Sequence, residues 1–142
     1  MRDIVTAIGA AKQPVVCWTG PTGARAASAG AIIMLGCPYA AMAPGTNIGA
    51  AHPVGFSGEV MSEKVTNDAA AYARALAQAH GRDARIAEAM VRDSTSLTAD
   101  EALHRRLIDA VASTRTDALR EAIAAACAKH LARACTAPAN PA

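Results

Sequence analysis

Ser28 is the residue of this sequence best placed for covalent chemistry. It stands among small residues between Gly23 and Ala31, after an apolar run at 15–18 that predicts a strand. The apolar residues 32–35 that follow predict a buried helix. A strand, a Gly-rich turn and a helix that starts at a hydroxyl residue are a known way to present a nucleophile. The free N–H groups and the positive dipole end of such a helix stabilise a developing oxyanion.

A serine nucleophile needs a base within reach, and only histidine and lysine supply one here. His52 follows a small-residue turn at 49–51, whereas the histidines at 80, 104 and 130 are expected to face solvent. Arginine stays protonated, so the few lysines matter more than the many arginines. Lys64 ends an exposed loop, just before a helix predicted from Asn67. The residues alone leave Lys64 and His52 open, and also leave open that neither acts, because exposed lysines and loop histidines commonly have no chemical role.

The elements that position these residues alternate between helices and strands. The pattern predicts helices at 1–12, 26–36, 67–79, 83–92 and 116–134, and another that opens at the capping-box pair Thr98 and Glu101. Strands are predicted at 15–19, 39–43 and 107–111, with a turn-rich loop at 44–49 and an exposed loop at 52–62. This alternation is typical of an α/β fold with a mostly parallel sheet covered by helices.

Composition narrows the class further. The chain of 142 residues is 52% hydrophobic but only 3% aromatic, so its single core must be built from Ala, Val, Ile, Leu and Met. No basic cluster with aromatics supports nucleic-acid binding. No cysteine and histidine spacing indicates a metal, and no cofactor is expected. Cys17 and Cys37 lie in apolar runs and are expected to be small core residues outside any disulfide framework.

The uncharged stretch at 26–58 raises the question of a membrane span. Glycines and prolines interrupt it, so a buried helix followed by a buried strand is the favoured interpretation. Neither a signal peptide nor a transmembrane segment is expected in this sequence.

A set of motifs, in order and with similar spacing over residues 1–112, resembles the protease domain of the NfeD family. The members of this family are membrane-bound serine proteases with a Clp-protease-like fold, often paired with stomatin-type proteins. The matching segments are ARAASAG at 24–30, MAPGTNIGAAHP at 42–53, KVTNDA at 64–69, GR at 81–82, SLTADEAL at 96–103 and ID at 108–109.

The resemblance implies a Ser–Lys dyad, with Ser28 as nucleophile and Lys64 as general base. The backbone N–H of Ala29 would be one oxyanion donor. Thr46 and Asn47 are candidates for the substrate-binding wall, although a turn-forming role explains both equally well. The implied substrates are hydrophobic peptide segments, including that of a stomatin-like partner. The family also suggests a homo-oligomer, at least a dimer, that is membrane-associated with its protease domain outside the cytoplasm.

The sequence departs from the family in three ways. The family has a Gly-Gly-containing turn upstream of the point where this sequence begins, so the first strand–helix units and part of the oxyanion hole are expected to be missing. The family's glycine before Ile108 is replaced within His104–Leu107, so that turn is expected to differ. The expected organisation is a partial protease domain at 1–112, an Ala-rich helix at 113–135 and a disordered tail at 136–142 in place of the family's membrane helices.

Three hypotheses follow from the sequence. The first is a serine endopeptidase domain that uses Ser28 and Lys64. The second is a catalytically inactive, truncated homologue that acts only in assembly. The third is a crotonase-like acyl-CoA enzyme on the related fold, for which no residue marks an acyl-CoA site.

Overall fold

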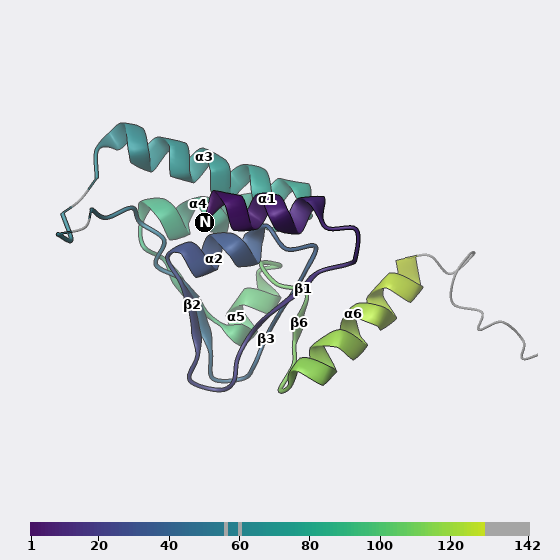
Figure 1. Cartoon of the computed structure of the whole chain (residues 1–142). Coiled ribbons are helices and arrows are strands. Elements are labelled where there is room, and N and C mark those ends of the chain that lie inside the picture. The colour runs from purple at the N-terminus through teal and green to yellow at the C-terminus, as the bar shows by residue number, and fades with distance from the viewer. Residues whose placement is uncertain (56, 60, 130–142) are drawn as a thin grey trace, which may run out of the picture.

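The computed structural model describes residues 1–55, 57–59 and 61–129 of the chain (Figure 1). Helices and strands are interspersed along it as the sequence predicts, although two pairs of strands and one pair of helices follow each other directly. The helices are α1 (Arg2–Ala10), α2 (Ala29–Leu35), α3 (Glu63–Ala79), α4 (Ala84–Arg92), α5 (Ala99–His104) and α6 (Arg115–Lys129). The strands are β1 (Val16–Thr19), β2 (Arg25–Ala27), β3 (Tyr39–Met42), β4 (Asn47–Gly49), β5 (Ser96–Thr98) and β6 (Ala110–Val111).

The strands form two small sheets. In the first, β1, β3 and β6 are parallel in the order β1-β3-β6. In the second, β4 lies between β2, to which it is parallel, and β5, to which it is antiparallel. Turns at 20–24 and 43–46 lead from the first sheet to the second, and Gly45 takes a φ of 71° in the latter turn.

Two sequence predictions are wrong at the second sheet. The segment Arg25–Ala27 is a strand and not the start of a helix, because it pairs in register with Asn47–Gly49. That partner segment is likewise a strand within the predicted turn-rich loop. Three-residue strands are too short for a hydrophobic period to reveal them.

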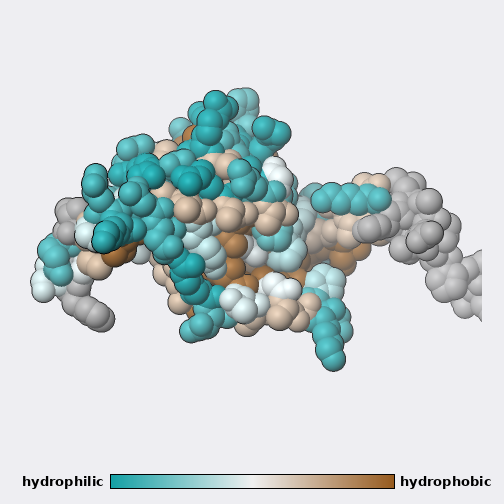
Figure 2. Space-filling view, turned by 90° about the horizontal axis from the view of Figure 1, so that it is seen from above, coloured by the Kyte–Doolittle hydropathy of each residue, from teal (hydrophilic) through white to brown (hydrophobic). Residues whose placement is uncertain are grey.

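The core lies between α2 and the helices α3, α4 and α5, and alanine dominates it (Figure 1). The buried residues of α3 are Ala70, Ala73 and Ala77, all fully buried. Seen from the side of α1 and α3, hydrophilic residues cover much of the surface, with apolar surface showing between them (Figure 2). A smaller core cluster lies under α6, where the Trp18 indole N–H donates to the Ala112 carbonyl at 2.9 Å.

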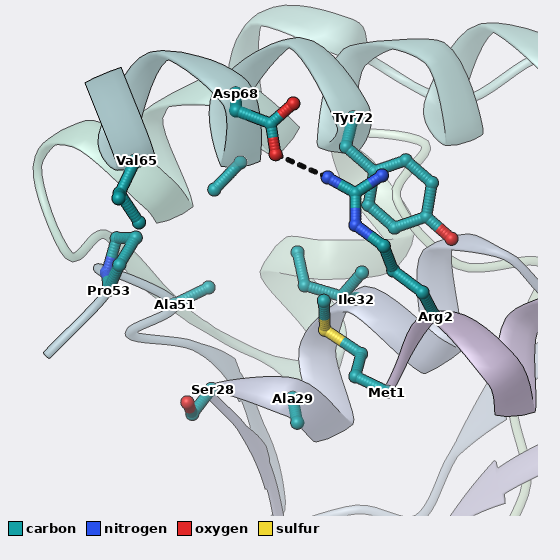
Figure 3. Close-up of a pocket in the computed structure, with 11 residues that line it drawn as sticks. Met1, Arg2, Ser28, Ala29, Ile32, Ala51, Pro53, Val65, Asp68 and Tyr72 are labelled. Carbon is teal, nitrogen blue, oxygen red and sulfur yellow. Dashed lines mark hydrogen bonds and ion pairs between the residues drawn. The ribbon is translucent and has the colours of Figure 1, made fainter. Parts of the chain in front are cut away.

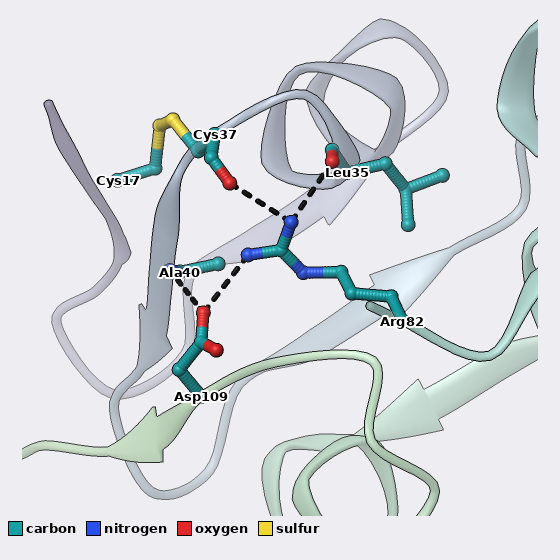
Figure 4. Close-up of a disulfide and its surroundings, with 6 residues drawn as sticks. All are labelled: Cys17, Leu35, Cys37, Ala40, Arg82 and Asp109. Atoms are coloured by element: carbon teal, nitrogen blue, oxygen red, sulfur yellow. Dashed lines mark hydrogen bonds and ion pairs between the residues drawn. A yellow bond between two sulfur atoms is a disulfide. The ribbon is translucent and has the colours of Figure 1, made fainter. Parts of the chain in front are cut away.

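Arg82 fixes the C-terminal end of α2, the helix that starts beside Ser28 (Figure 4). Its buried guanidinium donates to the carbonyls of Leu35 at 3.0 Å and Cys37 at 2.8 Å, and to Asp109 at 2.9 Å. Burial lowers the pKa of Arg82, and the Asp109 carboxylate opposes that effect. A cation at this end also complements the negative end of the helix dipole.

Cys17 and Cys37 are joined by a disulfide beside this network (Figure 4). The prediction of small core residues outside any disulfide is therefore wrong. The physical reason is that β1 and β3 are neighbours, with Cys17 opposite Ala40, and Cys37 stands just before β3. Their Cα atoms are 6.1 Å apart, a separation that disulfides commonly span.

Two further expectations concern helix ends. The capping box is confirmed, since the Thr98 hydroxyl accepts from the Glu101 amide and the Glu101 carboxylate accepts from the Thr98 amide. In the turn before Ile108, which is predicted to differ from the family's, Arg106 adopts the left-handed conformation with a φ of 56°.

The Ala-rich helix is confirmed as α6 over Arg115–Lys129. The tail predicted at 136–142 and the last residues of that predicted helix lie outside the described residues. Among the helices that the structure describes, none combines the length and hydropathy needed to cross a bilayer.

Candidate active site

Ser28 occupies a strained junction between β2 and α2. Its φ of 52° and ψ of −118° are sparsely populated for any residue other than glycine. The backbone around it holds this conformation: the Ser28 amide donates to the Gly49 carbonyl at 3.1 Å, and its carbonyl accepts from the Ala31 amide at 3.1 Å. The side chain is exposed. Backbone strain of this kind costs about 1–3 kcal/mol and is concentrated at functional sites.

Gly49 supports the serine from the second sheet. Its φ is 139°, and a Cβ at this position would lie 2.1 Å from the Thr95 carbonyl oxygen. Only glycine therefore lets β4 approach the chain before β5 this closely. The Gly49 carbonyl is thereby placed where the Ser28 amide binds it.

Ala29 is the first residue of α2 and is exposed beside Ser28. An amide in the first turn of a helix has no partner within that helix, so it is available to an incoming oxygen. It also lies at the positive end of the helix dipole.

An apolar pocket of about 260 Å³ lies beside Ser28 and Ala29 (Figure 3). It is bounded by α2, by the start of α3, by residues after β4 and by the beginning of α1. Arg2 and Asp68 are its charged residues, and Figure 3 shows them meeting between α1 and α3. The lining residues are Met1, Arg2, Ser28, Ala29, Ile32, Ala51, Pro53, Val65, Asp68, Ala69 and Tyr72.

Lys64 lies in the first turn of α3, which begins at Glu63. The prediction that Lys64 ends a loop before a helix at Asn67 is therefore wrong by one helical turn. Its side chain is exposed, and it does not line the pocket, although the next residue, Val65, does. Catalytic hydrogen bonds are often long or open before substrate binds, so this placement leaves Lys64 a candidate base.

The structure gives the other candidates supporting contacts. His52 has its Nδ1 2.8 Å from the Val91 carbonyl, which occupies that ring nitrogen. The buried Thr46 hydroxyl donates to the Ala43 carbonyl at 2.6 Å, within the turn that leads to β4. Asn47 opens β4 opposite Arg25 and Thr98. None of these three lines the pocket beside Ser28.

Sequence reasoning missed the part that α1 plays in this site. Met1 and Arg2 line the pocket, and Arg2 contacts Asp68 and Tyr72 of α3. Arg2 and Asp68 are 66 positions apart, so no local pattern could have paired them.

A strained serine between a strand and a helix, on mostly parallel sheets covered by helices, indicates the class. The fold is the α/β fold shared by Clp proteases and crotonases. The structure of ClpP1 from Listeria monocytogenes superposes with a TM-score of 0.61 at 19% identity, over 81% of this chain and 66% of that one. An enoyl-CoA hydratase from Thermoplasma volcanium superposes with a TM-score of 0.56 at 15% identity, over 89% of this chain and 45% of that one. Both likenesses concern the fold alone.

Sequence comparison identifies a nearer relative within this class. The membrane-bound protease PH1510 of Pyrococcus horikoshii is 44% identical over an alignment of 126 positions, which covers 85% of this chain and 29% of that protein. The chain is a homologue of this stomatin-specific membrane protease, matching its 1510-N protease domain. No protein-family model matches the chain.

Two solved structures of that domain are variants. A lysine-to-alanine variant in complex with a substrate peptide has a TM-score of 0.80 at 41% identity, over 84% of this chain and 57% of that one. A serine-to-alanine variant has a TM-score of 0.79 at 41% identity, over 84% of this chain and 60% of that one. The chain thus spans less than two thirds of the solved domain.

Proposed function

We propose that this chain is a serine endopeptidase domain with Ser28 as nucleophile and Lys64 as general base. The observation that carries the proposal is the strained, exposed Ser28 at the start of α2, beside an apolar pocket. Homology to a membrane-bound protease supports the same reaction. The relative's domain has been solved as a lysine-to-alanine variant with a substrate peptide and as a serine-to-alanine variant, the two residue types that the proposed dyad uses.

The proposed reaction proceeds in two steps. The neutral amine of Lys64 takes the Ser28 hydroxyl proton while Oγ attacks the peptide carbonyl, and the amide N–H of Ala29 binds the developing oxyanion. The C–N bond breaks, and the leaving amine receives the proton from Lys64. Water then attacks the acyl-enzyme while Lys64 accepts a proton from it. The ester bond to Oγ breaks, Lys64 returns the proton to the Ser28 Oγ, and the carboxylate product leaves.

The pocket favours a hydrophobic peptide as substrate. Its walls are mostly apolar, and its volume of about 260 Å³ exceeds the cavity of about 150 Å³ that holds benzene in another protein. One large apolar side chain therefore fits beside Ser28. A hydrophobic segment of a stomatin-like protein is the proposed natural substrate, by analogy with the relative that is specific for a stomatin homolog.

The second candidate function is a catalytically inactive homologue that acts in assembly. The observation that favours it is that this chain covers 57% of the relative's solved protease domain. Loss of one oxyanion donor costs about 10²–10³ in rate in a characterised enzyme, so an oxyanion hole that draws on the uncovered part would leave this segment inactive by itself.

Cleavage of a hydrophobic peptide designed on a stomatin C-terminal segment tests the two candidates. The parent chain is compared with Ser28→Ala, Lys64→Ala and the matched control Lys12→Ala, with products identified by mass spectrometry. Cleavage that is lost in the first two variants and kept in the control is the expected result. If the parent does not cleave, alone or when joined to the upstream Gly-Gly segment that the family resemblance implies, the protease proposal is wrong.

A further inference from the structure

Arg2 and Asp68 form an ion pair at the rim of the pocket beside Ser28 (Figure 3). The Arg2 guanidinium also lies 4.1 Å from the centre of the Tyr72 ring, a cation–π contact. The two charged side chains are 51% and 72% exposed, so the pair adds little to the stability of the fold. The pair lies across the pocket from Ser28, so its position points to a role in binding or in the reaction.

Asp68 lies one helical turn after Lys64 on α3. Side chains four residues apart are neighbours on a helix surface, and a lysine and an aspartate at this spacing attract each other. A neighbouring carboxylate favours the ammonium form of a lysine, which cannot accept a proton. An ion pair with Asp68 would therefore keep Lys64 protonated and unable to act as a base. In the structure Asp68 pairs with Arg2 instead.

We propose that Arg2 is a positioning residue: it holds the Asp68 carboxylate beside Tyr72 and so keeps it from pairing with Lys64. The consequence for catalysis rests on the proposed function. The competition for Asp68 is a property of the folded chain and can be measured without substrate.

Other charged groups around the first turns of α3 are already engaged or remain constant. Glu63 precedes Lys64, and Asp3 follows Arg2 on α1. Neither residue is changed in the variants below, so their effects cancel when the Lys64 midpoints of variant and parent are subtracted. The engaged groups are Arg92 with Glu88 and Asn67, His52 with the Val91 carbonyl, and Glu59 with the Ser57 amide.

The chain has three lysines, Lys12, Lys64 and Lys129, so ¹³C-labelled lysine gives few side-chain NMR signals to assign. The protonation of each amine is followed against pH in the parent chain, Arg2→Ala, Asp68→Asn and the double variant. We expect Arg2→Ala to move the Lys64 midpoint to higher pH by about half a unit, as for an exposed helical ion pair. The double variant should reverse this shift.

The decisive quantity is the coupling between the two substitutions. Removing Asp68 should matter more when Arg2 is absent than when it is present, because only then does Asp68 reach Lys64. If the two effects add, Arg2 acts on Lys64 through its own charge alone and the proposal is overturned. The matched control is Arg74→Ala on the same helix α3, which breaks the 2.8 Å ion pair between Arg74 and Glu88 of α4 and should leave the midpoint unchanged.

Cleavage kinetics carry the result to function. At neutral pH, kcat/KM should fall about two- to fivefold in Arg2→Ala, and the double variant should recover it. If the titration shows coupling but Arg2→Ala leaves the Ser28-dependent cleavage rate unchanged, the positioning role is overturned. Coupling without cleavage by any variant upholds the competition for Asp68 and refutes the protease proposal instead.

Discussion

Replacing Ser28 by glycine should stabilise the fold while replacing it by alanine should not. Both changes remove the hydroxyl, but only glycine adopts a φ of 52° with a ψ of −118° without strain. Relief of that strain is worth about 1–3 kcal/mol. The greater freedom of glycine in the unfolded chain takes back about 0.4–1 kcal/mol.

The net expectation is that the free energy of unfolding of Ser28→Gly is about 1–2 kcal/mol higher than that of Ser28→Ala. Urea unfolding followed by circular dichroism measures this difference, which is about 0.5–1 M in the midpoint for a slope of about 2 kcal/mol/M. Ala29→Gly, one residue along in the first turn of α2, is the control. It should destabilise by up to about 1 kcal/mol, because glycine is unfavourable in a helix.

The opposite signs at neighbouring positions isolate the backbone conformation as the cause. A glycine variant at position 28 that is no more stable than the alanine variant would refute the claim that the serine is held under strain. Equal responses at positions 28 and 29 would refute it as well.

Two further predictions concern the far end of α2. Arg82→Met should lower the free energy of unfolding by about 3–5 kcal/mol in urea titrations, because two buried carbonyls and Asp109 lose their donor. The control Arg85→Ala, at an exposed position, should change it by less than about 0.5 kcal/mol. Similar values for both variants would contradict the anchoring role of Arg82. Burial and the nearby Arg82 cation lower the pKa of His80 below its ordinary value, so the stabilisation from a neutral His80 is present above about pH 6.5 and is lost as the pH falls through the lowered pKa. Unfolding midpoints measured across this pH range should therefore decline less steeply in His80→Gln, and parallel curves would show that His80 does not contribute.

The sequence indicates the α/β class and the candidate nucleophile because these depend on local signals. The turn at Ser28 lies between two apolar runs that are long enough to predict a strand and a helix. The capping-box residues Thr98 and Glu101 predict where α5 begins. The fold resemblance drawn from short motifs is confirmed by the superpositions.

What the sequence does not give depends on contacts across the fold. The strands Arg25–Ala27 and Asn47–Gly49 exist because each pairs with the other, which neither segment reveals alone. The Cys17–Cys37 bridge follows from the β1–β3 pairing, and the position of Arg2 at the pocket follows from its ion pair with Asp68 of α3. The roles of Ser28, Lys64 and Ala29 in catalysis remain predictions for the cleavage assay.

The alanines buried along α3 determine which changes the core tolerates. Ala70, Ala73 and Ala77 have one methyl group each and no exposed area, so truncation at these positions removes little volume. Enlargement is the hazard, since an added methylene in a close-packed interface forces neighbours from their rotamers at a cost of about 1–3 kcal/mol. Random substitution should therefore damage this core by crowding more than by cavities, and a valine in α3 would push the helix that carries Lys64 away from the helix that begins at Ser28.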